Sequence, residues 1–242
     1  MILIPTMDDW WQLTREFPQF RKASDSVLKD FGYMSLLREI RQQRPKRVLE
    51  FGHGFNKTLF ELSENDANVE MWGVDDFQGL HYFPDRKGWE ETYQDELVTR
   101  FPKAKFARGL LGEHKRKSTE LPEGYFDMVC SVSVLEEVPL KAATDIVSHC
   151  YRLLRPNGVF MGTHDICLRN MERIKLFIDA CCACGFQCEG VRTPTELDGT
   201  GLLIENPTVV MLNYQNDEGE HRRYRGHWTT LLTRMLKPSV NT

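Results

Sequence analysis

A chain of 242 residues, of which 41% are hydrophobic and 27% charged, is long enough to build one α/β domain around a sizeable core. Its formal net charge of −4 gives no general attraction to nucleic acids or anionic membranes, and no apolar stretch approaches the about 20 residues that cross a bilayer. The amino terminus lacks the basic segment of a secretory signal. We therefore expect a cytoplasmic protein that acts on a small molecule and has no nucleic-acid or membrane partner.

Residues 1–45 precede the first predicted strand and combine helix-compatible residues with many aromatic side chains. We predict that this segment forms a helical cap. Its aromatic residues and Tyr33 either shape a binding pocket or simply pack onto the helices of the sheet.

The next stretch, residues 46–51, is an apolar run that ends in Glu50 and is followed by Gly52-x-Gly54. A helical pattern follows, and a second apolar run over residues 69–75 ends in Asp75. A strand, a glycine turn, a helix and a second strand that ends in an acid are the order of a nucleotide-binding unit. Glycines allow a ligand to lie against the backbone, although short Gly-x-Gly turns also occur in ordinary loops.

The third glycine of the dinucleotide fingerprint is missing, because Phe55, Asn56 and Lys57 stand in that region. This departure argues against NAD. Strands are also predicted over residues 104–108 and 126–131.

The segment from Tyr125 to Pro139 joins Phe-Asp to an apolar strand, a serine and Val-Leu-Glu-Glu-Val. A helical pattern over Ala142 to Leu154 follows, then an Arg-Pro-Asn-Gly turn at residues 155–158 and a strand over 157–163. Together with the acid and glycines after the first strand, these segments closely resemble the class I S-adenosylmethionine-dependent methyltransferases. This sequence departs from the family at Glu137, where many members have a histidine.

The resemblance implies that S-adenosylmethionine is the cofactor and leaves as S-adenosylhomocysteine. In the family the glycine turn passes under the methionine part of the cofactor, and the acid after the second strand binds both ribose hydroxyls. The residues that would bind the cofactor here are Glu50, Gly52, Gly54, Asp75 and Ser131. The adenine contacts stay unassigned, although Leu110 and Leu111 offer apolar surface after the third strand.

Strands predicted at 185–191 and 207–214 complete the family's set by element order. The expected fold is α/β, a doubly wound, seven-stranded, mostly parallel sheet with an antiparallel edge hairpin and a helical N-terminal cap. We divide the chain into the cap at 1–45, the cofactor-binding domain at 46–214 and a C-terminal extension at 215–242.

Seven irregularly spaced cysteines fit a reducing compartment rather than a disulfide scaffold. Cys181-x-x-Cys184 with Cys188 suggests either a metal or redox site or, as we favour, packing, because Met171 to Cys184 reads as a helix with Cys181 on its apolar face.

Methyl transfer requires the acceptor to be aligned and, for a hydroxyl, a base. His164 follows the fifth strand at the edge where acceptors bind and is our first candidate, with Glu136 and Glu137 next. Either glutamate could instead cap the following helix. Glu136, His164 and Asp165 could also bind a divalent cation, but no ligand spacing requires a metal and we expect none.

The C-terminal extension mixes basic and aromatic residues before a predicted helix over Thr229 to Leu236. Arg222, Arg223 and Arg225 either form a solvated or oligomer-contacting surface or bind an anionic acceptor.

We predict an enzyme that methylates a small molecule or sugar, at oxygen. The alternatives are a non-catalytic binding or assembly protein that keeps the fold, and a dehydrogenase. The acceptor and the oligomeric state do not follow from the sequence.

Overall fold

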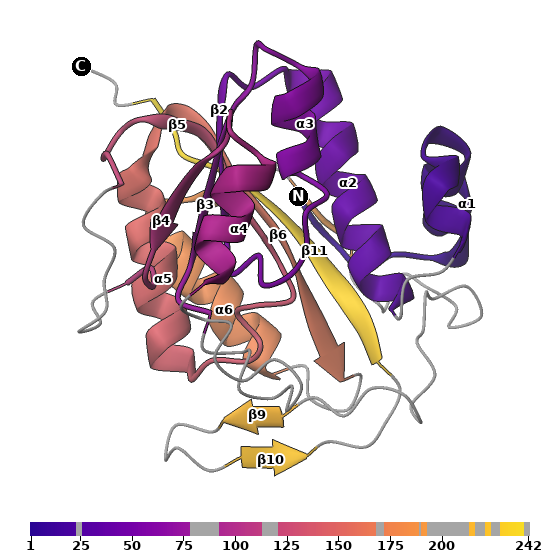
Figure 1. Cartoon of the computed structure of the whole chain (residues 1–242). Helices are drawn as coiled ribbons and strands as arrows, with labels where there is room; N and C mark the ends of the chain where they lie inside the picture. Colours follow the sequence, from indigo (N-terminus) through magenta and orange to yellow (C-terminus); the bar gives the residue numbers. More distant parts are fainter. Residues whose placement is uncertain are drawn as a thin grey trace.

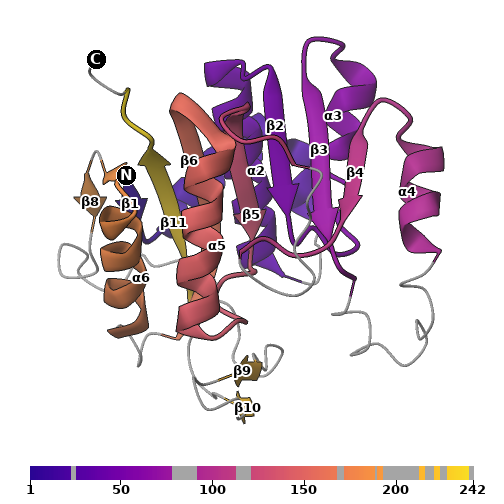
Figure 2. The same cartoon turned by 90° about the vertical axis from the view of Figure 1, so that its left-hand side faces the viewer.

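The computed structural model describes residues 1–22, 26–77, 92–112, 121–167, 172–188, 190–192, 213–215, 221–223 and 228–239. A central sheet runs through the molecule with helices on both faces (Figures 1 and 2). Among the described residues, no helix is long and apolar enough to cross a membrane.

Five neighbouring strands of this sheet run parallel in the order β4-β3-β2-β5-β6. Their bounds are β2 Arg47–Phe51, β3 Glu70–Asp75, β4 Lys105–Arg108, β5 Phe126–Val132 and β6 Leu154–Cys167. From β2 the chain first builds outward through β3 and β4, and then returns to build β5 and β6 on the other side. The strand order therefore reverses between β2 and β5, and the carboxyl ends of these two strands are the expected ligand-binding edge.

The remaining strands of the sheet lie beyond β6. β11 (Trp228–Leu236) runs antiparallel to β6, and its other side pairs with β1 (Ile2–Leu3) and β7 (Gln187–Cys188). β8 (Val191–Arg192) pairs with β1. A separate two-stranded sheet consists of β9 (Asn213–Gln215) and β10 (His221–Arg223).

The mostly parallel α/β architecture with antiparallel strands at one edge is confirmed, but the predicted details of that edge are wrong. The described residues place nine strands in the sheet instead of seven. The segment predicted as a helix, Thr229 to Leu236, is strand β11 and takes the position next to β6. The strand predicted at 185–191 is divided between β7 and β8. Of the strand predicted at 207–214, only residues 213 and 214 are described, and they belong to the separate sheet.

Each face of the sheet is covered by its own group of helices. On one face lie α1 (Met7–Glu16), α2 (Val27–Gln43), α3 (Phe60–Asn65) and α4 (Tyr93–Arg100), and a short 3₁₀ helix (Pro18–Lys22) links the first two. The opposite face is covered by α5 (Leu140–Leu153) and α6 (Glu172–Ala183). Apolar side chains alternate along the strands between these two layers, which gives the molecule two hydrophobic cores.

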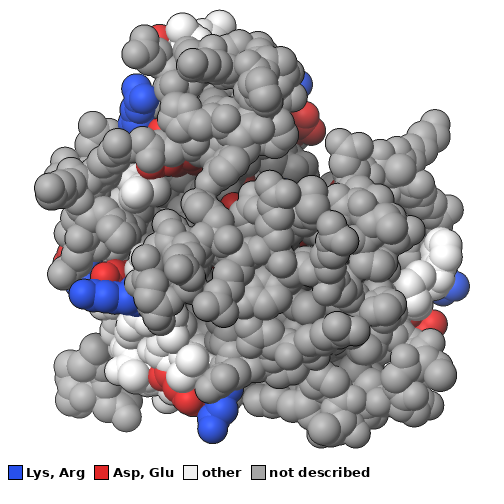
Figure 3. All heavy atoms as spheres, turned by 90° about the horizontal axis from the view of Figure 1, so that it is seen from below, with Lys and Arg blue, Asp and Glu red and all other residues white. Residues whose placement is uncertain are grey.

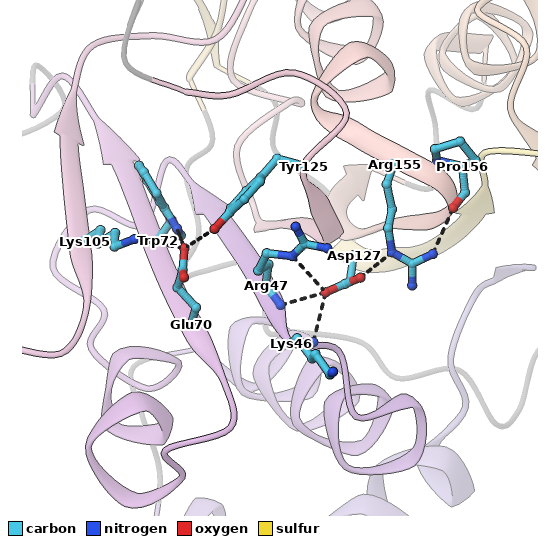
Figure 4. A network of polar contacts seen from close by, with 9 residues as sticks. All are labelled: Lys46, Arg47, Glu70, Trp72, Lys105, Tyr125, Asp127, Arg155 and Pro156. Carbon is cyan, nitrogen blue, oxygen red and sulfur yellow. Dashed lines mark hydrogen bonds and ion pairs between the residues drawn. The ribbon is translucent and has the colours of Figure 1, made fainter.

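Charged networks join the amino ends of the strands, opposite the ligand-binding edge (Figure 4). Asp127 Oδ2 accepts hydrogen bonds from the backbone N–H groups of Lys46 at 3.0 Å and Arg47 at 2.8 Å, and Oδ1 pairs with the Arg155 guanidinium. This carboxylate thus ties β2, β5 and β6 together. A second carboxylate, Glu70, accepts from Trp72, Tyr125 and Lys105.

Candidate functional site

The carboxyl end of β2 holds a buried carboxylate, Glu50, that is 0% exposed. Strand alternation points it toward α2, because its neighbour Val48 packs in the core on that face while Leu49 packs in the opposite core. Tyr33 on α2 donates a hydrogen bond of 3.0 Å to Glu50 Oε1. Glu50 Oε2 has no hydrogen-bond partner among the described residues. Burial raises the pKa of Glu50 to about 8, against the opposing effect of the Tyr33 hydrogen bond.

The turn that follows β2 depends on two glycines in the left-handed region. Gly52 has φ +66°, and a Cβ built on it would lie 2.6 Å from a methyl carbon of Val134. Gly54 has φ +52°, and a Cβ built there meets no described atom within 4 Å. Gly52 is therefore required by close packing against the segment after β5, whereas Gly54 leaves room beside the backbone for a ligand.

Asp75, at the end of β3, is bound to this turn. Its Oδ2 accepts a hydrogen bond of 2.8 Å from the Gly54 N–H, and its Oδ1 accepts one of 2.6 Å from the Phe77 N–H. Each oxygen keeps a second lone pair for a ligand hydroxyl. The structure thus brings Glu50, both glycines and Asp75 together at one edge, as the sequence predicted from the spacing of the motifs.

The side chain of His53, which lies between the two glycines, is buried beneath the turn. Its ring is 4% exposed and lies edge to face against Phe60 and Phe77, with ring centroids 4.9 Å and 5.6 Å away. Its Nδ1 is 3.1 Å from the Gly54 carbonyl oxygen. Burial lowers the pKa of His53, so the imidazole is neutral at physiological pH. These contacts do not follow from the sequence, because Phe60 of α3 and Phe77 after β3 lie in different parts of the chain.

The loop after β4 is also fixed. The Gly112 N–H donates a hydrogen bond of 3.0 Å to His149 Nδ1 on α5, and the Gly109 N–H donates one of 3.0 Å to the Asp75 carbonyl. Leu111 is buried and Leu110 is half-buried in this loop.

The end of β5 carries two buried serines, Ser131 within the strand and Ser133 directly after it. Ser131 lies two residues after Val129, so its side chain is on the same face of the sheet, toward the core with α5. Its hydroxyl lies near Gly162. Glu50 faces α2, so the structure does not bring the Ser131 side chain to the face that Glu50 occupies. Ser133 has φ +55°, an unusual value for a residue with a side chain, and its N–H donates to the Thr163 carbonyl at 2.9 Å.

Several buried polar oxygens at this edge have no hydrogen-bond partner within the described ranges. They are Glu50 Oε2, Ser131 Oγ, Ser133 Oγ, Glu136 Oε2 and Thr163 Oγ1. Buried polar atoms are rarely left without a partner in native proteins, and a group of them is expected where a ligand binds.

The three candidate catalytic residues lie in different environments. Glu136 is 4% exposed, and its Oε1 accepts a hydrogen bond of 3.0 Å from the Asp165 N–H. Burial, together with the nearby Asp165 and Glu137 charges, raises the pKa of Glu136 well above its usual value. His164 is 5% exposed, and its ring packs against the ring of Phe177 of α6 with the centroids 4.5 Å apart. Its Nε2 lies 3.1 Å from Thr233 Oγ1. Glu137 is exposed.

The metal alternative receives no support from the described part of the chain, which contains no group of three or more His, Cys, Asp or Glu side chains arranged to hold an ion. Cys181 is 0% exposed in the core with α5, as predicted for packing. The side chains of Arg222, Arg223 and Arg225 lie outside the described residues.

Seen from the end at which the parallel strands finish, described acidic and basic side chains both appear on the face of the molecule (Figure 3). The site thus combines a glycine turn, a buried carboxylate behind it, a second carboxylate beside it and a group of hydroxyls. It suits a ligand with a cationic group and neighbouring hydroxyls.

Comparison with known families gives a match over residues 49–162 to the methyltransferase domain family. This segment includes Glu50, the glycine turn, Asp75 and the whole of β5. A comparison with proteins of curated function found no match.

Several solved structures share the fold at low sequence identity. A proposed sarcosine dimethylglycine methyltransferase from Galdieria sulphuraria has a TM-score of 0.52 and 14% identity, over 85% of each chain. A S-adenosylmethionine-dependent methyltransferase from Methanosarcina mazei has a TM-score of 0.51 and 14% identity, over 85% of this chain and 98% of the other. The [4+2]-cyclase SpnF has a TM-score of 0.50 and 12% identity, over 86% and 82%. At these identities the likeness shows the fold alone.

Proposed function

We propose that this chain, which matches the methyltransferase domain family over residues 49–162, uses S-adenosylmethionine to methylate a small molecule or sugar at an oxygen atom. The observation that carries this proposal is the group of buried hydroxyls at the ligand-binding edge. Ser133 Oγ and Thr163 Oγ1 have no partner among the described residues and would bind the hydroxyls of an acceptor. The net charge of −4 also favours a small acceptor over a nucleic acid.

S-Adenosylmethionine supplies a methyl group on a sulfonium, which leaves as S-adenosylhomocysteine. The residues of this chain fit the cofactor, because Glu50 Oε2 is a buried acceptor without a described partner and Gly54 leaves open space beside the turn. We propose that these two residues hold the methionine part with Gly52, and that Asp75 binds the ribose hydroxyls. Ser131 is proposed to contribute to the cofactor site from the far side of β5.

Of the three proposed catalytic residues, Glu136 has the strongest structural support. It is buried at the acceptor edge, its Oε2 has no partner in the described part of the chain, and its raised pKa makes it a stronger base once it loses its proton. His164 is a weaker candidate because its ring packs against Phe177. Glu137 is exposed and would act only if the acceptor reaches it.

The proposal is tested with S-adenosylmethionine that carries an isotope-labelled methyl group and a panel of sugars, phenols, amines and RNA. We expect the label to appear on oxygen in a hydroxylated small molecule, as identified by nuclear magnetic resonance of the product. Glu136→Gln should lower kcat about 100-fold or more, while the exposed control Glu61→Gln should not change it. Label found only on amines or RNA would contradict the proposed acceptor.

A further inference from the structure

The hydrogen bond between Tyr33 and Glu50 joins a helix outside the matched family segment to a residue inside it. Tyr33 lies on α2, whereas the family match begins at residue 49. The Tyr33 hydroxyl donates a hydrogen bond of 3.0 Å to Glu50 Oε1. Both residues are buried, with exposed fractions of 4% for Tyr33 and 0% for Glu50. With Oε1 occupied, Oε2 is the oxygen that remains without a described partner.

Within the described ranges, no cationic side chain balances the charge of Glu50. The described titratable groups that interact electrostatically with Glu50 are Tyr33 on α2, Asp75 on β3 and Cys130 on β5. Asp75 opposes ionisation, and only the Tyr33 hydrogen bond favours it. A buried carboxylate in such a place ionises readily only when a cationic group comes beside it.

The position of Tyr33 is fixed by the close packing of α2 on the sheet. A Cβ built on the preceding residue, Gly32, would lie 2.6 Å from Thr163 Oγ1 and 3.0 Å from Val132 Cγ1. At the other end of the helix, Glu39 pairs with Arg234 of β11 at 2.8 Å. The phenol therefore has little freedom to leave Glu50.

Resting on the proposed function above, we propose that Tyr33 is a positioning residue for the cofactor: it holds Glu50 Oε1 so that Oε2 receives the ammonium group of S-adenosylmethionine. Helix α2 is then part of the cofactor site, and its docking on the sheet controls cofactor affinity. Tyr33 acts through Glu50 and does not itself contact the reacting atoms.

The first test compares two ligands by calorimetric titration. S-Adenosylhomocysteine has the ammonium group, and 5′-methylthioadenosine lacks the whole amino-acid part. Tyr33→Phe should weaken S-adenosylhomocysteine binding about tenfold, in the range expected for a hydrogen bond to a charged group, and leave methylthioadenosine binding unchanged. The matched control is Tyr125→Phe, which loses a 2.9 Å hydrogen bond to the carboxylate of Glu70 at the opposite end of the strands and should change neither affinity.

The second test follows the affinity for S-adenosylhomocysteine as a function of pH. In the wild type the affinity should rise as the pH approaches about 8, where Glu50 loses its proton. In Tyr33→Phe this rise should move to higher pH, because the hydrogen bond that lowers the pKa of Glu50 is lost. Glu50→Gln should remove this rise, and adding Tyr33→Phe to Glu50→Gln should have no further effect.

The positioning role would be overturned if Tyr33→Phe lost the same affinity for both ligands. It would also be overturned if the losses of affinity in Tyr33→Phe and Glu50→Gln added up in the double variant, and Tyr33 would then be a packing residue. If Tyr33→Phe bound S-adenosylhomocysteine as tightly as the wild type across the pH range, the positioning role would also be overturned. The proposed function would not be affected by that result. If the wild type binds neither ligand, the proposed function and this inference fail together.

Discussion

The two glycines after β2 both adopt positive φ, but only Gly52 is also closely packed against another residue. Alanine at Gly52 would combine a strained backbone with a clash against Val134, so we expect Gly52→Ala to lower the free energy of unfolding by about 2–4 kcal/mol. Gly54→Ala carries the backbone cost alone, about 1–2 kcal/mol, but should weaken cofactor binding because its Cβ occupies ligand space. Denaturant unfolding and calorimetric titration separate the two effects. Equal stability losses would contradict this division.

Glu50 should make the stability of the ligand-free protein depend on pH. Its pKa is raised from 4.5 to about 8 in the folded chain, so between these values the folded state holds a proton that the unfolded chain releases. The stability from this group is fully present below about pH 4.5 and is lost as the pH rises to about 8. We expect the wild-type Tm to fall by several degrees between about pH 6 and pH 8 relative to Glu50→Gln. Parallel Tm profiles for the two proteins would show that Glu50 is ionised throughout.

The proximity of Glu50, Gly52, Gly54 and Asp75 could be predicted from the sequence, because they stand at or just after the ends of two apolar strands. Parallel strands end at the same edge, so the spacing along the chain determines proximity. Tyr33 could not be assigned to Glu50 in this way, because a contact between residues 17 positions apart depends on how α2 docks. The acceptor side was less predictable, since whether His164 faces α2 or α6 depends on the register of β6.

At the level of elements, the docking of α2 depends on the absence of a side chain at Gly32. Alanine normally favours a helix by about 1 kcal/mol over glycine, but here its Cβ would lie 2.6 Å from Thr163 Oγ1. We predict that Gly32→Ala lowers the free energy of unfolding by about 1–3 kcal/mol, measured by chemical denaturation. Gln42→Ala, at an exposed position of the same helix, should have almost no effect. A stabilised Gly32→Ala protein would contradict the tight packing of α2.

Strand β11 was predicted as a helix because its local apolar pattern is misleading. Residues 229–236 carry leucines and a methionine at spacings that fit one face of a helix. In the structure Leu231 and Met235 pack in one core and Leu232 in the other, because β11 is covered on both faces. A strand buried on both sides has no strict alternation of apolar and polar residues. The threonines at 229, 230 and 233 favour a strand, but that signal is weaker than the apolar pattern.

At the scale of the whole molecule, the two ends of the chain complete one sheet. Leu232 of β11 lies opposite Thr163 of β6 on one side and Leu3 of β1 on the other. Proline in such a central strand removes a ladder hydrogen bond, so Leu232→Pro should abolish the cooperative thermal transition seen by circular dichroism. Leu232→Val, which keeps the ladder, should retain it. A folded Leu232→Pro protein would show that β11 is not needed to hold the sheet together.

We propose that the edge formed by β2 and β3 binds S-adenosylmethionine. Calorimetric titration of the wild type and Asp75→Ala with S-adenosylmethionine and S-adenosylhomocysteine tests it most directly. We predict binding at micromolar concentrations by the wild type and loss of binding in Asp75→Ala. The variant lacks the carboxylate that accepts the Gly54 N–H hydrogen bond and that we propose binds the ribose hydroxyls. No binding by the wild type, or undiminished binding by Asp75→Ala, would contradict the account.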